Sequence, residues 1–263
     1  MGILIALLTL SLIILVHEYG HYWMMRRCGV QVVEFTIGFG PTLWEKELKS
    51  GTIFRLKPII LGGYTRPVET GPNSMEQTTR GQRALIYLGG MLANAVTAFV
   101  AIAIVRYLTM TYLGILHPLV GWAPRYVKPG LSALLESFGI WLATPFILVW
   151  FIVRHFSEML GSMSGPIGII AFGSQVATIK ATAFMRVMAW LDVFGTLSAA
   201  VAGFNLIPLM PLDGGRILDL LVEKWLPYPA VIKAWRYAGV IVFLGLIVLA
   251  FSADISRFIL HRH

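Results

Sequence analysis

The sequence contains very little cysteine and little charge. Cys28 is the only cysteine among 263 residues, which excludes an internal disulfide and leaves no cysteine spacing for a metal. Charged residues make up 13% of the chain and hydrophobic residues 57%, and the mean hydropathy is +0.76. These values exclude an ordinary soluble domain and predict a chain that crosses a membrane several times.

Basic residues outnumber acidic ones, with a formal net charge of +8. They lie in loops between apolar segments, so we interpret them as topology signals and lipid headgroup contacts rather than as a nucleic-acid surface. Nine of the 21 Lys and Arg lie between Arg26 and Arg83, and two lie between Tyr107 and Gly130. By the positive-inside rule the first loop is cytoplasmic and the N-terminus is extracytoplasmic.

The hydrophobic residues gather in segments of the length that a membrane-spanning helix needs. We expect an all-α polytopic bundle of about four transmembrane helices, and up to six. The apolar segments are Gly2–Met25, Ala84–Leu108, Leu131–Val153, Met185–Asn205 and Tyr237–Phe251. Of these, Leu131–Val153 is open: it is a re-entrant or interfacial helix, or half of a hairpin completed by Ser164–Ile179.

A different pattern separates the first two apolar segments. In Val30–Pro67, apolar and polar residues alternate on either side of the turn Lys49-Ser50-Gly51. Alternation of period two around such a turn predicts a small membrane-associated β-hairpin or sheet. We expect Gly62-Gly63 to end it.

The first apolar segment carries the sequence His17-Glu18-Tyr19-Gly20-His21. On a helix, residues four apart share a face, so both imidazoles can hold one Zn²⁺ while Glu18 stands beside it. Soluble zinc hydrolases use this arrangement to activate water. Ionisable residues at membrane depth are costly and indicate function, which here points to hydrolysis within the bilayer.

A catalytic zinc usually takes three protein ligands, and Asp213 is the candidate for the third. It follows Pro208 and Pro211, which interrupt the helix, and precedes a Gly-Gly pair that permits a tight turn. His17 lies roughly 22 Å into a core of about 30 Å, nearer the cytoplasmic side. Asp213 reaches that depth only if Met185–Asn205 runs in the same direction as the first span.

Two other classes of function use intramembrane His and Asp residues or the same fold. A metal or ion transporter would pass a cation between them, but it does not require Glu18 at that spacing and would need further acidic residues along a path. An inactive membrane scaffold or chaperone would retain the fold without turnover. Both alternatives are separable from an enzyme by replacing Glu18 with Gln.

The motifs together resemble the site-2 protease family of intramembrane zinc metalloproteases, and within it the bacterial regulator-of-sigma-E protease (RseP) type. The resemblance covers both ends of the chain and much of its middle, in the family's order. The matching blocks are His17–His21, Arg26–Val30, Ile37–Pro41, Leu61–Tyr64, Ser164–Ile167 and Asn205–Gly215.

The resemblance implies one Zn²⁺ per chain held by His17, His21 and Asp213, with Glu18 as the general base in the attack of zinc-bound water. It further implies that Asn205 helps to hold the reacting peptide and its oxyanion. Asn94 is carried over as a residue near the substrate, although the family's Gly-Pro is here Gly90-Met91. The β-insertion would offer a strand edge to an unwound substrate.

One departure from the RseP type concerns substrate selection. Only about fifty residues separate the second span from Ser164–Ile167, too few for the family's PDZ domains, so substrates are selected in another way or through a separate adaptor. We therefore expect a single intramembrane protease domain over residues 1–263. Its parts are a first span (1–25), a β-insertion (30–67), a second span (84–108), a re-entrant or hairpin segment (131–180), a span with the third ligand (185–215) and a last span (237–253).

By the same resemblance, the substrate is a single-span membrane protein such as an anti-sigma factor or a remnant signal peptide. We expect the location to be the bacterial inner membrane, with an organelle membrane as the alternative, and the active site nearer the cytoplasmic side.

Overall fold

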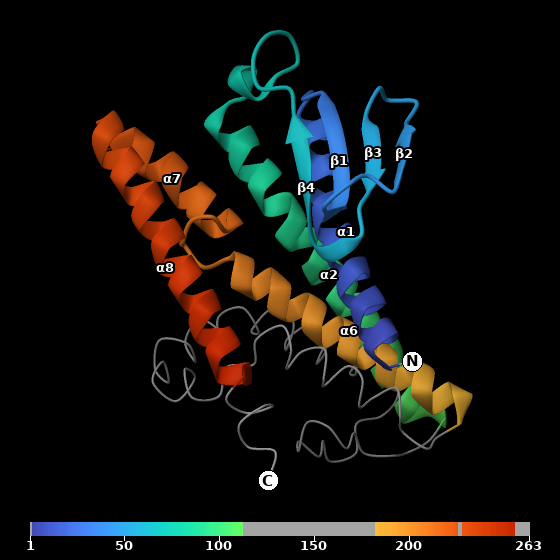
Figure 1. Cartoon of the computed structure of the whole chain (residues 1–263). Coiled ribbons are helices and arrows are strands. Elements are labelled where there is room, and N and C mark those ends of the chain that lie inside the picture. Colours follow the sequence, from blue (N-terminus) through green and yellow to red (C-terminus); the bar gives the residue numbers. More distant parts are fainter. Residues whose placement is uncertain (1, 113–181, 226–227, 256–263) are drawn as a thin grey trace.

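The computed structural model describes residues 2–112, 182–225 and 228–255. Within these ranges the chain is mostly helical, with one small sheet (Figure 1). Helices of spanning length and composition are α1 (Gly2–Arg27), α2 (Arg80–Tyr112), α6 (Ala183–Asn205) and α8 (Pro229–Ile255). The polytopic bundle with about four such helices and a small β-insertion is therefore confirmed. Leu131–Val153, Ser164–Ile179 and the segment that is too short for PDZ domains lie outside the described residues.

Three of the long helices pack around a shared apolar core. Ile13 of α1, Ala101 of α2 and Phe194 of α6 are buried against one another. In Figure 1 the N-terminal ends of α1 and α6 lie at the same end of the molecule as the C-terminal end of α2. The helix α6 thus runs in the direction that the sequence requires for Asp213 to reach His17.

The β-insertion forms a four-stranded sheet in the order β2-β3-β1-β4. Its strands are β1 (Val32–Phe39), β2 (Trp44–Glu47), β3 (Ile53–Leu56) and β4 (Ile59–Pro67). The predicted hairpin is β2 and β3, which pair antiparallel, while β1 pairs parallel with β3 and antiparallel with β4. A short 3₁₀ turn, η1 (Met75–Gln77), then leads to α2.

The expected end of the sheet at Gly62-Gly63 is wrong, because β4 continues through both glycines to Pro67. The reason is close packing rather than a turn. A Cβ atom on Gly63 would lie 2.8 Å from the Thr36 carbonyl oxygen and 3.1 Å from Cγ of Glu18. Gly63 therefore lets β4 lie directly on α1.

On the face of the sheet that points away from α1, the strands are linked by the buried carboxylate of Glu34. Glu34 of β1 is only 3% exposed, and its oxygens accept hydrogen bonds from Thr36 and Tyr64, both at 2.8 Å. The same carboxylate pairs with Arg55 of β3 at 2.7 Å and with Arg66 of β4 at 3.0 Å. Burial alone raises the pKa of Glu34, but these bonds and the nearby guanidinium outweigh it and lower the pKa to about 2. One side chain thus ties β1, β3 and β4 together.

Replacing Glu34 with Gln is expected to lower the thermal stability of the detergent-solubilised protein at pH 7, because two arginines lose their ionic partner. A carboxylate whose pKa falls on folding stabilises above its unfolded pKa and loses that contribution as the pH falls through the folded value. The Tm difference should therefore narrow between pH 4.5 and the pKa of about 2. A Tm difference that stays constant over this range would contradict the charged network.

Candidate metal centre

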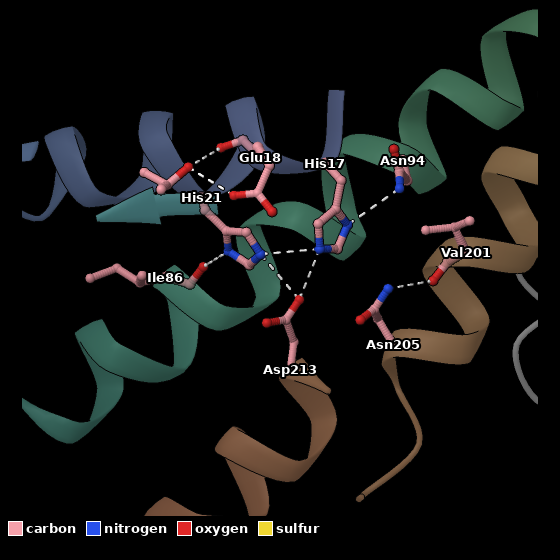
Figure 2. Close-up of polar contacts among 9 residues, drawn as sticks. His17, Glu18, His21, Ile86, Asn94, Val201, Asn205 and Asp213 are labelled. Carbon is pink, nitrogen blue, oxygen red and sulfur yellow. Dashed lines mark hydrogen bonds and ion pairs between the residues drawn. The ribbon is translucent and has the colours of Figure 1, made fainter. Parts of the chain in front are cut away.

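Three potential metal ligands lie close together, although they come from two helices that are far apart in the sequence (Figure 2). His17 and His21 project from the same face of α1, and Asp213 is the first residue of α7 (Asp213–Trp225). Each Nε2 lies 3.1 Å from Oδ2 of Asp213, and the two Nε2 atoms lie 3.2 Å apart. The side chains of His17, His21 and Asp213 are only 12%, 9% and 8% exposed.

Asp213 reaches the histidines because the chain turns sharply after α6. That helix ends at Asn205, where the segment with Pro208 and Pro211 can no longer continue it. Gly214 follows Asp213, and a Cβ atom there would lie 2.4 Å from the carbonyl oxygen of Leu206. The absent side chain allows α7 to begin against the turn, which aims the Asp213 carboxylate into the bundle.

The tautomer of His21 is set by a main-chain group. Its Nδ1 lies 2.8 Å from the carbonyl oxygen of Ile86 on α2. A carbonyl oxygen only accepts, so Nδ1 carries the proton and donates it. Neutral His21 then presents an Nε2 lone pair to the same point as the carboxylate of Asp213, an arrangement that needs a cation or a proton between them.

Asn94 of α2 contacts Nδ1 of His17, as the Ile86 carbonyl contacts Nδ1 of His21. It is fully buried, and its amide nitrogen lies 3.3 Å from Nδ1 of His17. Its Oδ1 is buried with no hydrogen-bond partner in the described part of the chain. If the amide is assigned in the flipped orientation, that oxygen lies at Nδ1 and accepts a hydrogen bond from Nδ1–H, which leaves Nε2 of His17 free to bind a metal.

The donor set fits zinc. Two imidazole nitrogens and one carboxylate oxygen form one of the ligand sets of catalytic zinc sites, which keep a further position for water. Zinc bonds of about 2.0–2.1 Å at tetrahedral angles put ligand atoms roughly 3.3 Å apart. The observed separations of 3.1 and 3.2 Å are close to that value.

Gly90 of α2 provides the space for the imidazoles. A Cβ atom at this position would lie 2.5 Å from Nε2 of His21 and 2.8 Å from Nε2 of His17. Any side chain here would occupy the place where the ligand atoms converge. The departure from the family pattern at Met91 thus leaves this glycine, on which the site depends, in place.

Glu18 lies beside the three ligands without joining them. Its side chain is directed to the same side of α1 as the two imidazoles (Figure 2). The hydroxyl of Thr65 on β4 lies 2.9 Å from Oε2 and donates to it. This leaves the other carboxylate oxygen as an acceptor for a proton at the site.

Asn205, the last residue of α6, faces the site from the side opposite Glu18 (Figure 2). Its amide nitrogen donates to the carbonyl oxygen of Val201 at 3.0 Å, one turn back in the same helix. An amide carries two N–H groups, so a second donor remains for a substrate oxygen. The structure therefore brings all six candidate residues of the sequence to one region, with Asn94 in contact with His17.

The sequence profile of peptidase family M50 matches residues 5–247. The match covers nearly the whole chain and includes every candidate ligand. The chain belongs to peptidase family M50, the site-2 proteases. This is the family that the motifs predict.

Individual M50 proteins are similar over parts of the chain. The regulator of sigma-E protease RseP of Escherichia coli K12 is 37% identical over 188 residues, which is 64% of this chain and 39% of RseP. The Yersinia pestis protease RseP is 39% identical over 104 residues, or 36% of this chain and 23% of that protein. A Pasteurella multocida protein provisionally named a zinc metalloprotease is 37% identical over 118 residues, or 41% and 26%. In these comparisons the chain matches well under half the length of its relatives.

Three neighbours of the candidate site were missed at the sequence level. Thr65 bonds to Glu18, Gly90 makes room for the ligands, and the Ile86 carbonyl orients His21. Because the sheet was predicted to end at Gly62-Gly63, Thr65 was not assigned to a strand. A strand that continues to Pro67 puts Gly63 and Thr65 on the same face, since side chains alternate with period two. No sequence signal marks a main-chain carbonyl as a histidine partner.

Changing Asp213 to Asn is expected to weaken zinc binding by about 100-fold or more, because a neutral amide is a poor zinc ligand. The matched control is Asp219→Asn, which changes another buried aspartate of α7 that pairs with Arg236. Zinc per chain after dialysis against a zinc-buffered chelator measures both. Equal zinc retention by the two variants would contradict the ligand assignment.

Proposed function

We propose that this chain is a zinc-dependent intramembrane endopeptidase that hydrolyses a peptide bond within a transmembrane segment of another membrane protein. His17, His21 and Asp213 hold the single zinc ion, and Glu18 is the general base. The observation that carries the proposal is the convergence of the two imidazoles and the Asp213 carboxylate on one point, with the free oxygen of Glu18 beside it.

The residues around this point divide the chemistry between them. When bound, zinc would act as a Lewis acid and lower the pKa of a coordinated water. Glu18 takes the proton from the attacking water and returns it to the leaving amine nitrogen. The second N–H of Asn205 donates to the oxyanion that develops on the scissile carbonyl. The buried Asn94 keeps His17 in its metal-binding tautomer, so its role is to orient a ligand rather than to touch the peptide.

Access to the peptide bond requires an unwound substrate, because an intact helix satisfies its own carbonyl and amide groups. The strand β4 lies at the edge of the sheet and, through Gly63 and Thr65, directly against Glu18. Its outer edge pairs with no strand in the described ranges 2–112, 182–225 and 228–255. An extended substrate segment adding to that edge would pass next to the base.

The topology follows from the basic loops. With the Arg26–Arg83 loop in the cytoplasm, the N-terminus is extracytoplasmic and the site lies nearer the cytoplasmic side of a bacterial inner membrane. Single-span proteins such as anti-sigma factors or remnant signal peptides are the substrates we expect. A separate adaptor protein would present them in place of PDZ domains.

Replacing Glu18 with Gln should reduce cleavage of a single-span model substrate in liposomes by at least about a thousandfold, because the base is lost. Zinc per chain should stay at the wild-type value, since Glu18 is not a ligand. Removing the zinc with a chelator should abolish cleavage in the wild type, and adding zinc back should restore it.

The same variant separates the alternatives. A transporter would retain zinc flux across the liposome membrane when Glu18 is Gln, and a scaffold would be indifferent to the change. Wild-type cleavage that survives in Glu18→Gln would contradict the role of the base, and cleavage that survives full zinc removal would contradict the metalloprotease.

A further inference from the structure

The side chain of Glu18 is hydrogen-bonded by a residue of the sheet, outside the His17–His21 motif. The hydroxyl of Thr65 lies 2.9 Å from Oε2 of Glu18 and 3.2 Å from the main-chain carbonyl oxygen of the same residue. A hydroxyl has one proton, and the shorter, charge-assisted bond to the carboxylate is the stronger of the two. Among the described residues, the Glu18 carboxylate makes no other side-chain hydrogen bond.

Strand alternation explains why Thr65 points at the helix. Thr65 pairs with Phe35 of β1, and residues directly opposite in an antiparallel pair share one face of the sheet. Phe35 packs against Tyr22 of α1 with 5.8 Å between ring centroids, so this face is the one on the helix. Gly63, two residues before Thr65, lies on the same face, where an added Cβ atom would lie 3.1 Å from Cγ of Glu18.

The neighbours of Thr65 fix its position from the other face. Tyr64 and Arg66 both bind the buried carboxylate of Glu34, at 2.8 and 3.0 Å. A slip of β4 by one residue would break both contacts and turn Thr65 away from α1. Thr65 is therefore the central residue of a clamped tripeptide whose two outer side chains are anchored in the sheet.

We propose that Thr65 is a positioning residue for catalysis: its hydroxyl fixes one oxygen of Glu18 so that the other faces the attacking water. The inference rests on the proposed base role of Glu18. Without the hydroxyl, the carboxylate gains rotational freedom about its terminal torsion, and the productive orientation becomes one of several. Thr65 does not contact the three metal ligands, so its effect is expected on turnover rather than on zinc content.

Thr65→Val tests this with a side chain of the same shape and no hydroxyl. We expect kcat to fall by about 10- to 100-fold with KM nearly unchanged, because the base is misoriented while substrate contacts persist. Zinc per chain should match the wild type. Thr65→Ser, which retains a hydroxyl, should restore most of the lost rate, which a purely structural role of the methyl group would not produce.

Thr97→Val is the matched control. It removes a threonine hydroxyl that donates to the Ala93 carbonyl oxygen at 2.8 Å within α2, without touching Glu18. This variant should keep the wild-type kcat. Unchanged kcat in Thr65→Val, or equal losses in the valine and serine variants at position 65, would overturn the proposal.

A second readout needs no substrate. Thr65→Val is combined with Glu18→Ala, and the Tm of the zinc-loaded proteins is measured for the four members of the cycle. The Tm loss caused by Thr65→Val should be smaller when the Glu18 carboxylate is already absent, and equal losses would overturn the contact. If the wild type cleaves nothing, the proposed function fails while this cycle still decides whether Thr65 holds Glu18.

Discussion

The structure depends on bringing three electron-pair donors together at one point inside an apolar bundle. The nitrogens of His17 and His21 and the carboxylate of Asp213 would repel one another or compete for a proton without a cation, and burial makes either costly. Asp213 is 192 residues from His21 in the chain. This convergence depends on the packing of α2 on α1, on the turn after α6 and on the start of α7. It also depends on Gly90, because a side chain there would overlap the imidazoles.

Different elements contribute different groups around the three candidate ligands. The helix α1 carries the proposed base and two candidate ligands. The helix α2 contacts the imidazoles through the Ile86 carbonyl and Asn94, and α7 carries the candidate carboxylate. The sheet is polar on the face where Glu34 gathers its arginines and close-packed on the face that meets α1. The strand β4 is thus anchored on one face and set beside Glu18 on the other. Under the proposed function, this would place an added substrate strand next to the bond that is cut.

How much was predictable depends on the range of each interaction. The long apolar helices and the β2–β3 hairpin follow from local periodicity, and the spacing of His17 and His21 follows from one helical turn. Asp213 was inferred from the helix-breaking prolines around it and from depth. The course of β4 was mistaken because Gly62-Gly63 has the composition of a turn. Instead, Gly62 leaves room for the Phe39 ring and Gly63 allows close approach to α1, and both contacts are tertiary. Thr65 and the Ile86 carbonyl act across such tertiary contacts, which no local pattern encodes.

Zinc K-edge X-ray absorption on the purified, zinc-loaded chain tests the convergence most directly. The account predicts two imidazole nitrogens and a carboxylate oxygen at about 2.0–2.1 Å, with a further light-atom ligand and no sulfur. The Asp213→Asn variant should lose this signature, while Glu18→Gln and Thr65→Val should retain it. A spectrum with sulfur ligation, or one without imidazole scattering, would contradict a zinc site built from α1 and α7.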